Sequence, residues 1–133
     1  SMQLVNPLFD NDLAGSWRSG APTPAAENND VLTDNIPPHI RQVRHSPKQP
    51  RSGEVMTITA KVTDSDGVKS VTLLYQLVEA GNYFGREHTR AYERWIAVDM
   101  HEDGLNGDLS INDGIYTVQL PGSLQIHRRL VRY

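Results

Sequence analysis

Apolar and polar residues alternate along several stretches of the chain, and this period-two pattern is typical of half-buried β-strands. The clearest stretch is 55–63, where every second residue from Met56 to Val62 is apolar and threonine or lysine stands between. The stretch 68–78 alternates in the same way, and its predicted buried face carries Val71, Leu73, Tyr75 and Leu77. Asp64-Ser65-Asp66-Gly67 lies between the two stretches and predicts the turn that joins them.

Four further stretches predict strands, and residues typical of turns separate them. They are 39–45, 95–100, 115–120 and 130–133. In 95–100 and 115–120, the side chains expected to face inward are Ile96, Val98, Met100, Tyr116, Val118 and Leu120. No stretch shows a convincing helical period. Short strands between frequent turns favour an all-β chain, and we expect an immunoglobulin-like antiparallel β-sandwich.

The first 36 residues differ from the rest, because they show little periodicity and contain chain breakers such as Pro7, Gly15 and Pro22. We expect the irregular end of a preceding domain in 1–26, a polar linker in 27–36 and the sandwich module in 37–133. Such a sandwich has about seven strands. The sixth predicted strand has only begun at Tyr133, so we expect the module to be incomplete at its C-terminus.

Composition narrows the classes of function. The net charge is −3, which argues against nucleic-acid binding. The chain has no cysteine, so disulfides, thiol catalysis and thiolate zinc sites are excluded. No apolar run approaches the ~20 residues of a membrane span. No secretion signal opens the chain, so for a secreted protein we expect the signal upstream.

Acidic residues gather in two predicted loops and raise the question of calcium, which takes about six to eight oxygen ligands. The candidate ligands are Asp64, Asp66, Asp103, Asp108 and Asp113. The spacing is not that of an EF-hand, since no helices flank the loops. Asp and Asn beside Gly also stabilise turns by hydrogen bonding to their own backbone, so structural turns are the alternative.

The segment 79–94 combines aromatic and arginine side chains, a composition that can bind sugars or proteins. Its candidate surface residues are Tyr83, Phe84, Arg86, Arg90 and Tyr92. The alternative is that these rings plug one end of the sandwich while the arginines pair with Glu79, Glu87 and Glu93. Neither a nucleophile-elbow serine motif nor a glycine-rich phosphate loop occurs. We therefore expect no enzyme activity and no catalytic residue in 1–133.

The order of several short motifs resembles a known arrangement of bacterial domains. Residues 1–26 resemble the end of a bacterial lamin-tail domain, through Gln3-Leu4-Val5-Asn6-Pro7, Ala14-Gly15-Ser16-Trp17 and Pro22-Thr23-Pro24, with Asn28 following in the linker. Residues 37–133 resemble the immunoglobulin-like or fibronectin type III-like module that follows such domains, often in proteins of planctomycete type. The matching pieces are His45-Ser46-Pro47, Thr63 to Val68, Leu74-Tyr75-Gln76, Gly81-Asn82-Tyr83, Asp103-Gly104, Gly107-Asp108, Asp113 to Thr117 and His127 to Tyr133. Ala80 stands where the family usually has proline.

The resemblance implies a large secreted or cell-surface protein in which a spore-coat H (CotH) kinase-like domain often follows this module. It implies a structural spacer that positions the downstream domain, with neighbouring domains of the same chain as partners. A carbohydrate- or protein-binding accessory module, with or without calcium, is the alternative. The kinase-like chemistry would lie beyond residue 133.

Overall fold

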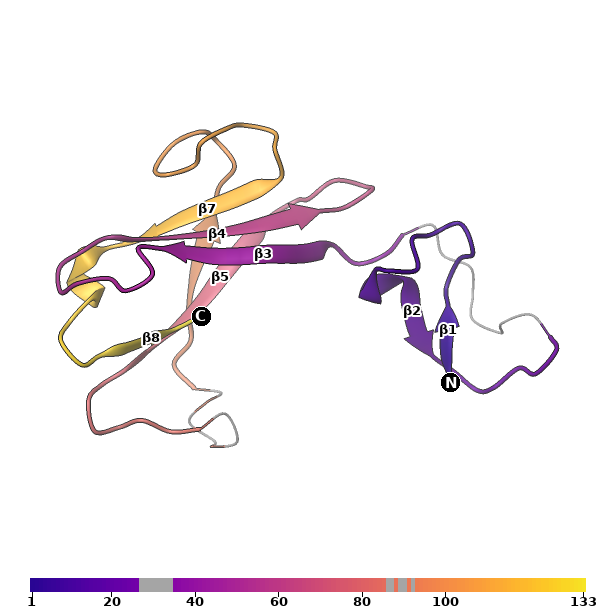
Figure 1. Ribbon diagram of the computed structural model, residues 1–133, viewed down its shortest axis with the longest axis horizontal. Coiled ribbons are helices and arrows are strands. Elements are labelled where there is room, and N and C mark those ends of the chain that lie inside the picture. Colours follow the sequence, from indigo (N-terminus) through magenta and orange to yellow (C-terminus); the bar gives the residue numbers. More distant parts are fainter. Residues whose placement is uncertain (27–34, 86–87, 89–90, 92) are drawn as a thin grey trace. The chain divides into compact units, whose positions relative to one another are not determined.

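The computed structural model describes residues 1–26, 35–85, 88, 91 and 93–133, and Figure 1 shows its elements. The chain divides into two compact units. One comprises Ser1–Ile40 with Thr63–Val68, and the other comprises Arg41–Val62 with Lys69–Tyr133. Most of the linker expected in 27–36 lies outside the described residues.

The N-terminal unit contains a small hairpin. Strand β1 (Met2–Leu4) pairs antiparallel with β2 (Trp17–Ser19), and a 3-10 turn, η1 (Ala14–Ser16), leads into β2. Val5 is only 1% exposed, and its amide donates to the Ser16 carbonyl at 2.9 Å. A segment expected to be irregular thus holds regular structure, because strands of three residues are too short to show an alternating pattern.

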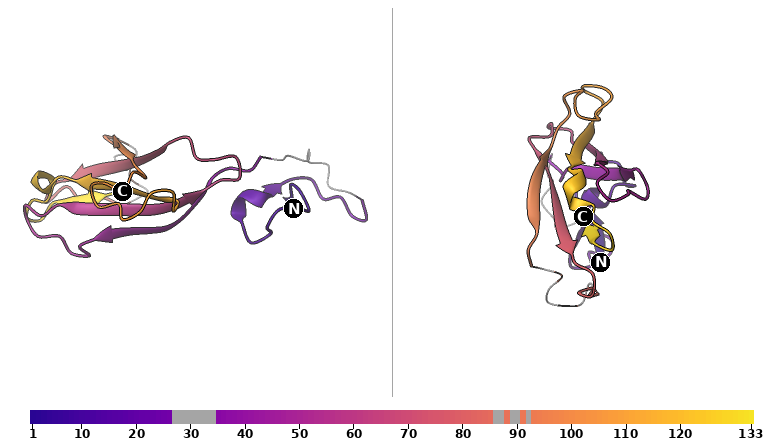
Figure 2. Two further views of the ribbon diagram at one scale, coloured as in Figure 1. Left: turned by 90° about the horizontal axis from the view of Figure 1, so that it is seen from above. Right: turned by 90° about the vertical axis from the view of Figure 1, so that its left-hand side faces the viewer.

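The second unit is an all-β sandwich made of two three-stranded sheets (Figure 2). In the first sheet, β4 (Met56–Thr63) lies between β3 (His39–Ser46) and β7 (Ile115–Leu120). In the second, β5 (Val71–Val78) lies between β6 (Ile96–Met100) and β8 (Leu130–Arg132). The predicted all-β fold class is confirmed, and each predicted strand is present.

The core follows the predicted alternation most closely in the first sheet. Every second residue of β4, from Met56 to Val62, is buried. Met56 pairs with Leu120 and Ile58 with Val118, so apolar side chains meet across the β4–β7 ladder. The second sheet contributes Leu73 and Met100. These inner faces pack together as the hydrophobic layer of the sandwich.

Strand β5 departs from simple alternation at its end. Leu73 is buried and its neighbour Leu74 is 52% exposed, as the register predicts. Gln76 and Val78 lie on the opposite face from Leu73 and are nevertheless 3% and 2% exposed. The cause is the segment after β5, because the Gln76 side-chain amide donates to the Glu93 carbonyl at 2.5 Å. This part of the sheet is therefore covered on both faces.

Ile96 is 43% exposed, so its predicted burial is wrong. It begins β6, which is an edge strand of the sheet formed by the described residues, and it lies opposite the half-buried Tyr75. Edge position at a strand end leaves an inward-facing side chain with few neighbours. Met100, at the other end of the same strand, is 6% exposed.

Strand pairing fixes which loops share an end of the sandwich. The end of β4 lies beside the start of β7, since Lys61 pairs with Ile115. The start of β5 lies beside the end of β6, since Val71 pairs with Met100. The connections after β4 and β6 therefore leave at the same end. Just past β6, His101 exchanges two backbone hydrogen bonds with Thr117 of β7, at 2.9 and 2.8 Å.

Leu73→Ala is expected to lower the free energy of unfolding by about 2–5 kcal/mol, the usual cost of truncating a buried leucine. Leu74→Ala is the matched control, because the neighbouring side chain is half exposed and its loss should change stability by only about 0.5 kcal/mol. Urea denaturation followed by tryptophan fluorescence measures both. Equal effects of the two substitutions would show that the register of β5 is wrong.

Candidate functional site

The acidic loop between β6 and β7 is organised around Asp108, whose side chain is buried. Asp108 is 6% exposed, and its two carboxylate oxygens accept the amides of Gly104 at 2.7 Å and Ser110 at 3.4 Å. Gly107 adopts a φ of +96°, and a Cβ there would come within 3.0 Å of the Thr57 side chain. Asp108 thus holds a tight loop that packs against β4.

The other candidate calcium ligands also act within their own turns. Asp64 accepts the Asp66 amide at 3.1 Å, Asp103 accepts the Leu105 amide at 2.9 Å, and Asp113 accepts the Ile115 amide at 2.8 Å. Among the described residues, no group of three or more metal-ligating side chains is placed to hold an ion. These hydrogen bonds are the ones expected if the aspartates stabilise turns, and the calcium site stays a prediction.

Glu102 joins this loop to β7. Its carboxylate accepts the Gly114 amide at 2.5 Å, just before β7 begins. The pKa of Tyr116 is raised, first by burial, then by the nearby negative charge of Glu102 and by a hydrogen bond to it. The protonated phenol is therefore the form that the fold stabilises.

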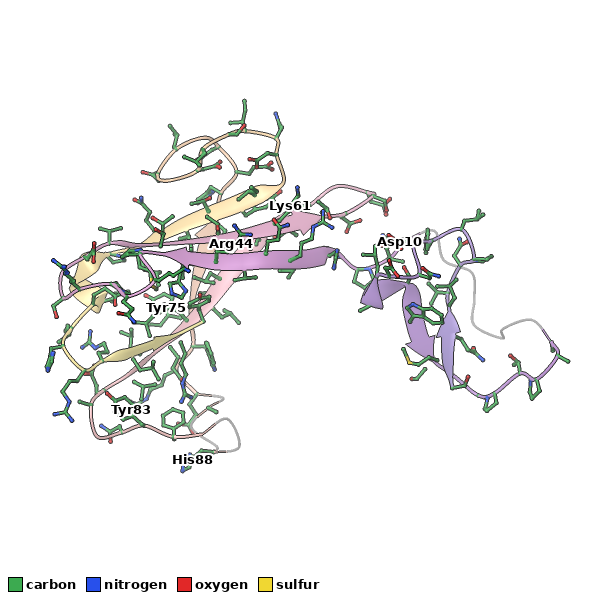
Figure 3. All side chains as sticks on the ribbon, in the orientation of Figure 1. Asp10, Arg44, Lys61, Tyr75, Tyr83 and His88 are labelled. Atoms are coloured by element: carbon green, nitrogen blue, oxygen red, sulfur yellow. The ribbon has the colours of Figure 1, made fainter. Side chains whose placement is uncertain are left out.

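The predicted aromatic and arginine surface is described in part. Tyr83 is 54% exposed, and its hydroxyl donates to the Arg128 carbonyl. Tyr83 and His88 both lie on the connection between β5 and β6 (Figure 3). Arg86, Arg90 and Tyr92 lie outside the described residues.

Phe84 has a structural role in the same segment. The Arg132 guanidinium lies 4.7 Å from the centre of the Phe84 ring and donates a hydrogen bond to the Phe84 carbonyl. Glu79 forms an ion pair with Arg129 at 2.6 Å. Phe84 and Glu79 thus connect this segment to β8 and to the residues before it, although the ion pair of Glu79 is with Arg129 and not with an arginine of the segment 79–94.

A groove of about 570 Å³ lies at the other end of the sandwich, and the sequence alone did not reveal it. It is formed by the residues around the end of β3, the start of β4 and the segment leading into β8. The side chains that matter most are apolar or basic, namely Lys48, Arg51, Met56, Ile126, His127, Arg128, Leu130 and Val131. The basic character of these loops was visible in the sequence, but their convergence on a groove depends on tertiary packing.

A contact between the two sheets borders this groove. His45 of β3 and Tyr133, which follows β8, meet with the imidazole Nδ1 and the phenol oxygen 2.5 Å apart. The rings are 5.8 Å apart and nearly perpendicular. The other imidazole nitrogen lies 3.2 Å from the Lys48 carbonyl, which can only accept, so in the neutral imidazole the tyrosine hydroxyl is the donor to Nδ1. Burial raises the pKa of Tyr133, which keeps this donor protonated.

Asp108→Ala is expected to lower the free energy of unfolding by about 1–3 kcal/mol, because it leaves two backbone amides without their acceptor. Asp103→Ala should cost less, because Asp103 is exposed and accepts one amide. Thermal and urea unfolding measure both variants. Repeating the measurements at about 1 mM calcium, a concentration that extracellular modules sense, tests the metal hypothesis. Calcium stabilisation that disappears in Asp108→Ala would favour a metal site over structural turns.

Stability is expected to fall as the pH rises through about 10, the ordinary pKa of tyrosine. The folded chain raises the pKa of Tyr116, so the unfolded chain loses this proton first and is favoured in that range. Tyr116→Phe should make the fall shallower. Glu102→Gln should reduce the fall in stability in part. The glutamine side-chain oxygen still accepts the Gly114 backbone amide, but it carries no negative charge to raise the pKa of Tyr116. Urea midpoints measured between pH 8 and 11, on either side of that pKa, follow the effect; identical slopes for all three proteins would contradict it.

Within the part of the chain that the structure describes, no helix is long and apolar enough to span a bilayer. Comparisons with known protein families, with characterised proteins and with solved structures gave no match. The relationship to lamin-tail domains and to CotH kinase-like proteins therefore stays a prediction from sequence.

Proposed function

We propose that the chain is a non-catalytic spacer within a larger secreted or cell-surface protein, where it positions a downstream domain, in line with its resemblance to CotH kinase-like proteins. The observation that supports this proposal most is the use of the loop carboxylates. Asp103, Asp108 and Asp113 each accept backbone amides of their own loop. Side chains committed in this way stabilise a shape rather than hold a substrate.

The contacts at the groove end support the same proposal. The Gly53 amide donates to the Gln125 carbonyl at 2.9 Å, and Arg129 pairs with Glu79 at 2.6 Å. These contacts join three connections that are distant in the sequence. A sandwich whose loops hold one another gives a module a fixed length, which is what a spacer needs.

A carbohydrate- or protein-binding accessory module is the second candidate. Tyr83 and Trp95 favour it, because they are 54% and 38% exposed and large aromatic rings bind sugars and protein surfaces. The Trp95 indole nitrogen donates to the Ala91 carbonyl at 2.9 Å, which fixes the orientation of its ring. Such orientation favours binding by a preformed surface.

Replacement of the module in the parent protein separates the two candidates. We expect that exchanging 37–133 for an unrelated immunoglobulin-like domain of similar length preserves the activity and surface display of the downstream domain. Deleting 37–133 should impair them. A spacer tolerates exchange of its surface, whereas a binding module does not. Loss of function after exchange, together with glycan or protein binding that disappears in Tyr83→Ala but not in Leu109→Ala, would favour the accessory module.

A further inference from the structure

We propose that a pocket between the edges of β6 and β7 binds a basic side chain, arginine or lysine, of a partner protein. This interaction goes beyond the proposed spacer function and does not depend on it. Three observations support it: the make-up of the pocket wall, the charge of the pocket, and a buried hydroxyl that has no hydrogen-bond partner among the described residues.

The pocket has a volume of about 340 Å³, and its described lining comes from 98–106 and 117–119. It therefore lies between an edge strand of each sheet, β6 of the second and β7 of the first. β6 and β8 are on opposite sides of β5, so the pocket is across the sheet from the edge along which we expect the next strand. The volume is at the lower end of the range for small-ligand sites, about 300–1,000 Å³, which suits one side chain better than a peptide segment.

The described wall of the pocket combines valines with exposed polar side chains. Val98 is half-buried and Val118 is 7% exposed, because both occupy inward-facing positions of their strands. A basic side chain matches such a wall, since its methylene groups pack against apolar surface while its charged end stays among polar groups. The exposed polar residues of the wall are Asp99, His101, Asp103, Asn106 and Gln119.

Two carboxylates give the pocket its charge. Oδ1 of Asp99 accepts the Thr72 hydroxyl at 3.4 Å, and Oδ1 of Asp103 accepts the Leu105 amide at 2.9 Å. Among the described residues, neither carboxylate forms an ion pair, and no lysine or arginine lines the pocket. The second oxygen and the negative charge of each are therefore left for a ligand. A guanidinium or ammonium group supplies the opposite charge together with several N–H donors.

The buried hydroxyl belongs to Thr117, which lines the pocket from β7 and is 4% exposed. The Thr117 backbone is paired with His101 by two hydrogen bonds, at 2.9 and 2.8 Å. Its Oγ1, in contrast, has no hydrogen-bond partner among the described residues. A buried hydroxyl without a partner lowers stability, and an N–H group bound in the pocket would supply the missing donor.

A metal ion and a neutral sugar fit the pocket less well than a basic side chain. Within the described part of the chain, no group of three or more metal-ligating side chains is placed to hold an ion. A sugar would leave the charge of both carboxylates unneutralised. It would also find no phenylalanine, tyrosine or tryptophan ring among the described lining residues.

The test uses the whole chain and a capped glycine-arginine-glycine peptide at pH 8, where histidine side chains are ordinarily neutral. NMR titration should give saturable shifts at Val98, Asp103 and Thr117, with a dissociation constant of the order of 1 mM for so small a ligand. The same peptide with citrulline, which has a neutral group of similar shape, should bind at least about tenfold more weakly. Tighter binding of free putrescine than of the arginine peptide would reject a partner protein as the source of the cation.

Charge removal in the protein gives a matched pair of variants. The double substitution Asp99→Asn, Asp103→Asn keeps side-chain oxygens that accept the same hydrogen bonds, and it should weaken binding of the arginine peptide about tenfold or more. Asp66→Asn, the same change at an exposed aspartate outside the pocket, should leave binding unchanged. Circular dichroism verifies that both proteins are folded. Equal binding of the arginine and citrulline peptides, unchanged affinity in the double variant, or binding of N-acetylglucosamine in place of the arginine peptide would overturn the proposal.

Thr117→Val tests the buried hydroxyl separately. Binding of the arginine peptide should weaken about three- to tenfold, the usual effect of losing one hydrogen bond. The urea midpoint should rise, because the substitution removes a buried polar atom that has no partner in the described part of the fold. Unchanged binding together with a lower urea midpoint would overturn the assignment of Thr117 to the site.

Discussion

The sandwich depends on burial of one face of β4. This strand lies between β3 and β7, and its side chains from Met56 to Val62 alternate strictly between core and surface. Ile58 is fully buried, and the second sheet packs against the face of β4 that carries it. Because a slip of one residue would turn threonines and a lysine inward, the sequence permits a single register for β4. The pairing of β3 and β7 with β4, and the burial of Leu73 in the opposite sheet, follow from that register.

The loops depend on a different interaction, the hydrogen bond from a backbone amide to a carboxylate. Asp108 is buried among amides that it accepts, and Glu102 holds the residue before β7. A buried carboxylate is stable only when such donors replace water. The two backbone hydrogen bonds between His101 and Thr117 connect the end of β6 in the second sheet to β7 in the first. Core packing and loop hydrogen bonds therefore support each other at this end.

The strand stretches could be predicted from sequence because alternation is a local signal, and β4 shows it over eight residues. Burial of Gln76 and Val78 could not be predicted in the same way, because it depends on a segment that returns over the sheet from Glu93. The hairpin of β1 and β2 could not be predicted, because its short strands show no alternating pattern. The acidic loops allowed two interpretations, a calcium site or structural turns, because the same aspartates can bind a metal ion or accept backbone amides. The groove could not be predicted, because the sequence does not show which loops come together in the fold.

The two ends of the sandwich differ in how their charges are satisfied. At the end beyond β6, the carboxylates of Asp103, Asp108 and Asp113 accept nearby backbone amides, which stabilises the loop but leaves their negative charge in place. At the groove, the described lining residues include Lys48, Arg51 and Arg128 but no carboxylate, and Glu79 forms an ion pair with Arg129. The charges at the two ends therefore do different work: carboxylates beyond β6 hold the backbone of their loop in place, whereas Lys48, Arg51 and Arg128 at the groove are exposed to solvent.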